Sequence, residues 1–163
     1  MALVIEDGTG VAEANSYVTE AEIIDYAKAR GVVIVEGIAE VHAIKAMDFF
    51  WTQCLRGELA YPGEQWTLFP RRGLVKGDFD PEAILEIPSQ VKLAQLQLAL
   101  DSFNGIDLVP SRGAEPRLKR RKTGPIEREY FEQGGELPDL PLAMAILAPY
   151  LCRQGFRLRT YRA

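Results

Sequence analysis

The residues able to do chemistry are few and widely spaced. The chain has one histidine, His42, and two cysteines, Cys54 and Cys152. A catalytic nucleophile needs an activating base within hydrogen-bond reach, and a metal ion needs several ligands at regular spacing. Neither pattern occurs here, and His42 lies beside apolar residues at helical spacing, which is more typical of a structural side chain. We therefore expect no enzyme, no metal site and no cofactor.

Two segments resemble binding loops only in part. "GDFDPE" (77–82) carries carboxylates but lacks the D-x-D-x-D-G ladder of a calcium loop, so a solvated acidic turn is the better interpretation. "EDGTG" (6–10) is glycine-rich but lacks the G-x-x-x-x-G-K-[ST] pattern of a phosphate loop. Since Cys54 and Cys152 fall in two separate predicted helices, we expect no disulfide and reducing, intracellular surroundings.

The strongest chemical signal is the stretch "RLKRRKTGPIEREYF" (117–131), which has five cationic side chains in its first six residues. Lysine and arginine clusters of this kind neutralise phosphates. However, acidic residues flank the cluster, the sequence pI is near 5.1, and neighbouring residues of a strand lie on opposite faces. Nucleic-acid contact, a solvated charged hairpin and contact with another protein all stay open, and the sequence favours another protein.

Charge is distributed unevenly along a chain of otherwise ordinary composition. Residues 1–60 carry ten acidic and four basic side chains, residues 61–109 seven and four, and residues 110–163 six and eleven. With 47% hydrophobic and 26% charged residues, a soluble globular protein is expected. No apolar run reaches the roughly 18 residues of a membrane span, and no signal peptide is expected. Such polarity suits copies that pack head to side, or ends that meet different partners.

Apolar spacing predicts a mainly α fold, an antiparallel bundle of about four helices with a small β-hairpin and an extended C-terminal tail. Thr19 and Glu22 have capping-box spacing at the start of the first helix. The second is expected at 38–56, the third at 88–104, and the last after Asp139 with a bend at Pro149. In the second helix, one stripe is expected to be buried: Ile38, Val41, Ile44, Met47, Trp51 and Leu55.

We expect one domain at 1–152 and a basic arm at 153–163. Within the domain, a long loop rich in glycine and proline is expected at 57–87, and a hairpin at 117–131 turning at Gly124-Pro125. Tyr61, Trp66 and Phe69 could pack the long loop. The arm combines arginine with aromatic residues and has no core-forming period.

Four segments in register resemble a known family. They are "VIEDGTGVAEANSYVTEAEIIDYAKARG", "LFPRRG", "EIPSQVKLAQLQLAL" and "TGPIEREY". In this order they resemble the small head–tail adaptor (head-completion or neck) proteins of tailed bacteriophages, over about residues 3–150. One branch of that group carries the name DnaT-like single-stranded-DNA-binding protein. The basic "RLKRRKTG" departs from the mixed charge of the family's hairpin.

The resemblance implies a structural virion protein at the head–tail junction, assembled in the host cytoplasm and touching no membrane. It would form a ring, usually of twelve copies, between the portal protein and a tail-side neck, stopper or tail-completion protein. Packaged double-stranded DNA would pass through its lumen. The alternative that the resemblance offers is a single-stranded-DNA-binding protein of phage replication that uses the cluster at 117–122.

Two groups of site residues follow from this resemblance. The portal-binding arm would comprise Arg153, Phe156, Arg157, Arg159, Tyr161 and Arg162. The inter-subunit or tail-side hairpin, which could also contact DNA, would comprise Arg117, Lys119, Arg120, Arg121, Lys122, Ile126, Arg128 and Tyr130.

Overall fold

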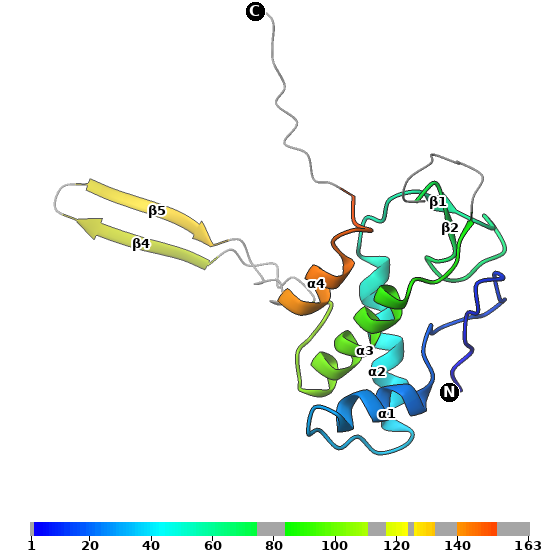
Figure 1. Cartoon of the computed structure of the whole chain (residues 1–163). Helices are drawn as coiled ribbons and strands as arrows, with labels where there is room; N and C mark the ends of the chain where they lie inside the picture. The colour runs from blue at the N-terminus through cyan, green and yellow to red at the C-terminus, as the bar shows by residue number, and fades with distance from the viewer. Residues whose placement is uncertain (1, 75–83, 111–116, 124–125, 133–139, 153–163) are drawn as a thin grey trace, which may run out of the picture.

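Four helices form the body of the protein in a computed structural model that describes residues 2–74, 84–110, 117–123, 126–132 and 140–152. The helices are α1 (Glu20–Lys28), α2 (Ile38–Trp51), α3 (Ser89–Phe103) and α4 (Pro141–Leu147). The central helix is α3, which packs against each of the other three (Figure 1). The predicted mainly α fold with a β-hairpin is confirmed.

The capping box predicted for the first helix is confirmed. The Glu22 amide donates to Thr19 Oγ1 at 3.3 Å, and the Thr19 amide donates to the Glu22 carboxylate at 2.7 Å. These reciprocal bonds satisfy backbone donors that the first turn of a helix leaves without partners. Ile23 and Ala27 then fix the buried side of α1.

The stripe predicted to be buried on the second helix is wrong in three of its positions. Ile38, Val41 and Trp51 are 45%, 51% and 54% exposed, and the helix ends at Trp51 rather than near residue 56. The side that packs inward is rotated by about one residue and carries Ala39, Ala43, Ala46, Met47, Phe49 and Phe50. Small alanine side chains let α2 approach α3 closely, which the larger β-branched side chains would prevent.

The third helix begins after Pro88 as predicted, and its central residues are buried. Val91, Ala94 and Leu98 are fully buried, whereas Leu93 is 38% exposed. Gln95 is also fully buried, and its amide accepts from the Tyr17 N–H at 2.9 Å and donates to Ser16 Oγ at 2.9 Å. A buried amide is stable only with such partners, so Gln95 ties the N-terminal segment to α3.

The long predicted loop holds a small sheet that its sequence did not predict. Its strands are β1 (Glu58–Leu59), β2 (Arg71–Arg72) and β3 (Ile84–Leu85), antiparallel in the order β1-β2-β3. Of the aromatic residues expected to pack the loop, Phe69 is fully buried, whereas Trp66 is 60% exposed. The acidic turn expected at 77–82 lies outside the described residues.

The predicted hairpin is confirmed as β4 (Arg117–Thr123) paired antiparallel with β5 (Ile126–Glu132). Its turn at residues 124–125 lies outside the described residues, as does Asp139, the expected cap of the last helix. That helix, α4, ends at Leu147, so Pro149 follows the helix instead of bending it. Among the described helices, none is both long enough and apolar enough to cross a membrane.

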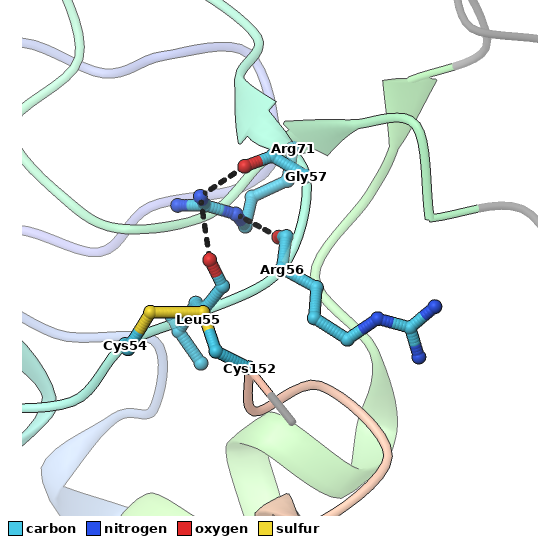
Figure 2. Close-up of a disulfide and its surroundings, with 6 residues drawn as sticks. All are labelled: Cys54, Leu55, Arg56, Gly57, Arg71 and Cys152. Atoms are coloured by element: carbon cyan, nitrogen blue, oxygen red, sulfur yellow. Dashed lines mark hydrogen bonds between the residues drawn. A yellow bond between two sulfur atoms is a disulfide. The ribbon is translucent and has the colours of Figure 1, made fainter. Parts of the chain in front are cut away.

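The expectation of no disulfide is wrong, because Cys54 and Cys152 are bonded to each other (Figure 2). The segment after α4 returns to the end of α2, where the Cys152 amide donates to the Cys54 carbonyl at 2.8 Å. The Arg56 amide likewise donates to the Tyr150 carbonyl at 2.8 Å. This pairing brings the two Cα atoms to 5.4 Å across 98 residues of chain, which the sequence spacing could not predict.

Candidate nucleic-acid interface

The single histidine joins two helices. His42 Nδ1 lies 2.9 Å from Ser102 Oγ, and its ring meets that of Phe103 edge-on at 5.5 Å. Partial burial, followed by the charge of Lys45, lowers the pKa of His42 below its ordinary value. Within the described ranges, no group of three His, Cys, Asp or Glu side chains could hold a metal ion.

The glycine-rich "EDGTG" segment is organised around a buried carboxylate. Glu6 is fully buried, and its Oε1 accepts from the amides of Gly8 and Gly10, each at 2.9 Å. Its Oε2 accepts from the hydroxyl of Thr67 at 3.4 Å, across 61 residues of chain. The amides that would cradle an anion therefore already have an internal acceptor, so this loop serves the fold rather than a phosphate.

The arginine of "LFPRRG" is equally committed to the fold. Arg71 is buried, and its guanidinium donates to the carbonyls of Leu55, Arg56 and Gly57 at 2.6–3.3 Å (Figure 2). It also donates to the carbonyl of Leu68 at 3.1 Å. Burial lowers the pKa of Arg71. Gly57 has a φ of +73°, and a Cβ there would collide with the Arg72 carbonyl. This arginine holds the disulfide-linked turn in place, and four of its five N–H donors are already bonded to backbone carbonyls.

The register of the β4–β5 hairpin divides its charges between two faces. Directly paired residues share a face, and successive residues alternate between faces. One face, here called the basic face, has four cationic positions and one acidic position. Its positions are Arg117, Lys119, Arg121, Thr123, Ile126, Arg128, Tyr130 and Glu132.

The opposite face, here called the balanced face, pairs its own charges. Arg120 stands opposite Glu129, Lys122 opposite Glu127, and Leu118 opposite Phe131. Opposite charges at paired positions stabilise a two-stranded ribbon. Three of the five clustered cations therefore lie on the basic face and two on the balanced face. Arg128 of β5 is the fourth cation of the basic face.

The basic face also places two like charges directly opposite each other, Arg121 and Arg128. Such a pair is destabilising unless an anion lies between or above the two side chains. Tyr130 stands opposite Lys119 on the same face and supplies an aromatic position beside the cations. Cations interleaved with an aromatic residue are the pattern that binds single-stranded nucleic acid.

Within the described part of the chain, the two strands of the hairpin pack only against each other. No helix and no other strand of the described residues packs against β4 or β5, and Figure 1 draws the hairpin apart from the helices. A ribbon of two strands alone is marginally stable in water, so it gains from a partner that covers one face. Among the described helices and strands, none occupies the place of such a partner.

The sequence predicted the hairpin residues as a group but did not predict how they divide between two faces. Because strand residues alternate between faces, one known pair is enough to divide the hairpin residues between the two faces. The pairing of Thr123 with Ile126 sets the whole register. The residues expected to form the portal-binding arm, 153–162, lie outside the described residues. They stay a prediction.

One comparison with known proteins gives a match. A family described as "Putative DnaT-like ssDNA binding protein" matches residues 1–163, the full length of the chain. No curated protein and no solved structure matches the chain.

Proposed function

Because the chain belongs to the DnaT-like ssDNA binding protein family, we propose that it binds single-stranded DNA through the basic face of the β4–β5 hairpin. The observation that carries this proposal is the register, which gathers four cationic positions and Tyr130 on one face. Consecutive residues of a strand cannot share a face. Three alternate residues of β4 and one residue of β5 nevertheless place four cations on the same face. The description of the family favours this function over a ring-forming adaptor.

Single-stranded DNA suits the basic face for two reasons. Its phosphates supply the anions that the opposed Arg121 and Arg128 positions lack, and its unstacked bases can lie against Tyr130. Double-stranded DNA offers phosphates but no free base faces. The acidic remainder of the chain, with seventeen acidic and eight basic residues in 1–109, repels DNA from the body and leaves the hairpin as the place of contact.

The test is oligonucleotide binding by two matched double variants. Lys119→Gln with Arg121→Gln removes two cations from the basic face, and Arg120→Gln with Lys122→Gln removes two from the balanced face. Fluorescence anisotropy with a labelled oligodeoxythymidine of about 20 nucleotides reports the affinity. We expect the first variant to weaken binding and to reduce the salt slope by about 1.4, since each lost contact with a single strand removes about 0.7.

The matched variant is expected to bind nearly as the unchanged protein does, because its cationic positions are paired in the register with carboxylate positions. Equal losses in the two variants would mean that total charge, not the basic face, drives binding. Flat anisotropy for the unchanged protein at about 50 mM salt would rule out single-stranded DNA as a ligand. Replacing Tyr130 with alanine should weaken binding by roughly 1–3 kcal/mol, against little change for Phe131→Ala.

A second function is favoured by a different observation, the absence of packing between the hairpin and the described body. We propose as this alternative a ring-forming head–tail adaptor of a tailed phage, in which the hairpin packs on a neighbouring copy or on the tail-side protein. An acidic ring lumen would let packaged double-stranded DNA slide past. Electron microscopy of the protein mixed with its phage portal protein tests this function: rings are expected, with or without the two basic-face cations.

A further inference from the structure

The outward side of α2 is an unusual surface for a helix of a folded body. Ile38, Val41, Lys45 and Asp48 follow one another at spacings of three and four residues and so share one side of the helix, here called the α2 face. Ile38 and Val41 are 45% and 51% exposed, and Lys45 and Asp48 are exposed as well. Two apolar and two charged positions are thus exposed on one side of α2.

A cleft continues the α2 face beyond the helix. Its volume is about 360 Å³, and its lining includes Lys45 and Asp48 of α2 together with residues 105–109, which follow α3. Two apolar side chains of that segment, Ile106 and Val109, are 37% and 47% exposed. Asp107 lines the same cleft. A cleft lined by apolar side chains, two carboxylates and one lysine can take a ligand that alternates apolar and cationic side chains.

We infer that the α2 face binds the C-terminal segment 153–163 of a second copy of this chain. That segment, "RQGFRLRTYRA", has four arginines and no acidic residue. As an extended strand it would place Phe156 and Leu158 on one side and Arg157 and Arg159 on the other. The apolar side matches the exposed isoleucine and valine side chains. The arginines match Asp48 and Asp107, which outnumber the one lysine of the cleft, Lys45.

The length of the segment is sufficient for this contact. Eleven extended residues span at most about 36–40 Å, whereas the fourteen residues of α2 span about 21 Å. One segment can therefore lie along the whole α2 face and still enter the cleft. No further part of the chain is needed.

The position of the disulfide separates the start of the segment from the exposed apolar side chains at the beginning of α2. Cys152 is bonded to Cys54, just beyond the C-terminal end of α2, whereas Ile38 lies at the N-terminal end. The segment thus leaves the body at one end of the helix, and the exposed apolar side chains begin at the other. The α2 face of one copy would bind the C-terminal segment of the next copy. Such a head-to-tail contact can be repeated from copy to copy until a ring closes.

This inference does not depend on DNA binding, because it uses neither hairpin face. In the free protein, where no portal protein is present, the C-terminal segment would bind a second copy of the chain. The experiment is sedimentation velocity of the full chain without DNA, from about 1 to 100 μM, at low and high salt. We expect association that weakens with salt, because arginine–carboxylate contacts at an exposed surface are screened.

Two variants break opposite halves of the same contact. Val41→Asp disrupts the α2 face, and Arg157→Glu with Arg159→Glu disrupts the segment. Each is expected to weaken association at least tenfold. Mixed in equal amounts, they should form dimers and nothing larger, since the first variant keeps an intact segment and the second an intact face. Val33→Asp is the matched control, because Val33 is 83% exposed but lies outside the α2 face.

Three results would overturn the inference. The first is an unchanged protein that stays monomeric over the whole concentration range. The second is association that survives both variants, which would place the contact elsewhere. The third is a mixture of the two variants that stays monomeric, because complementary halves on different copies must pair if the contact is between copies. Circular dichroism of each variant establishes that it remains folded, so a lost contact is not mistaken for a lost fold.

Discussion

Two arginine-rich segments of this chain have opposite structural roles. Arg71, in "PRRG", is buried and donates to four backbone carbonyls that no other side chain reaches in the described contacts. The arginines of "RLKRRK" lie on a ribbon against which no described element packs. The comparison teaches that residue type alone does not indicate a binding site. What decides is whether the donors of the guanidinium already have acceptors within the fold.

The largest expected effect breaks the buried side of this comparison. Arg71→Leu leaves carbonyls of Leu55, Arg56, Gly57 and Leu68 without their donor, so we expect the free energy of unfolding to fall by roughly 3 kcal/mol. Urea denaturation measures it. The matched change on the hairpin, Arg121→Leu, should leave the midpoint nearly unchanged. If the two variants lose the same stability, the distinction between a committed and an available arginine is wrong.

The second effect concerns the disulfide beside Arg71. Cys54→Ser with Cys152→Ser removes a cross-link over 98 residues, and we expect a loss of about 3 kcal/mol. Thermal unfolding with and without a thiol reductant measures it, and the double variant should no longer respond to the reductant. A protein equally stable with and without reductant would show that α4 is held by packing alone.

A smaller effect is pH-dependent and involves His42. Burial lowers the pKa of His42 in the folded state, so the unfolded chain binds a proton first as the pH falls. Stability is therefore fully present above the unfolded value of about 6.5 and declines as the pH falls below it, until the folded histidine also titrates. His42→Gln should flatten this slope between about pH 5 and 7. If the slope of stability against pH is unchanged in this variant, carboxylates and not His42 cause the pH dependence.

The smallest effect on stability is expected on the exposed side of the comparison. Lys119→Gln with Arg121→Gln should change the free energy of unfolding by less than about 0.5 kcal/mol, because no described element packs on the hairpin. Any change in the free energy of unfolding is expected to be a gain, since removing the charge of Arg121 relieves its repulsion with Arg128. A clear loss of stability in urea would mean that the basic face packs on its own body.

Local patterns predicted most of the elements. The capping box at Thr19 and Glu22 needs only residues within one turn, and the third helix and the hairpin likewise depend on short-range spacing. The stripe through Ile38 and Val41 failed because periodicity shows that a helix has sides, without showing which one meets α3. The candidate interface was predicted as a cluster, and its division into two faces required the strand register.

The sequence by itself determined a mainly α chain with a charged hairpin and an acidic body, because helix spacing, strand alternation and charge are all local properties. Only the tertiary structure decided which arginine is buried, which side of α2 faces outward, and that Cys54 meets Cys152. Those outcomes depend on contacts between residues far apart in the chain. Their free energies come from burial and from satisfied hydrogen bonds, which exist only once the elements are packed together.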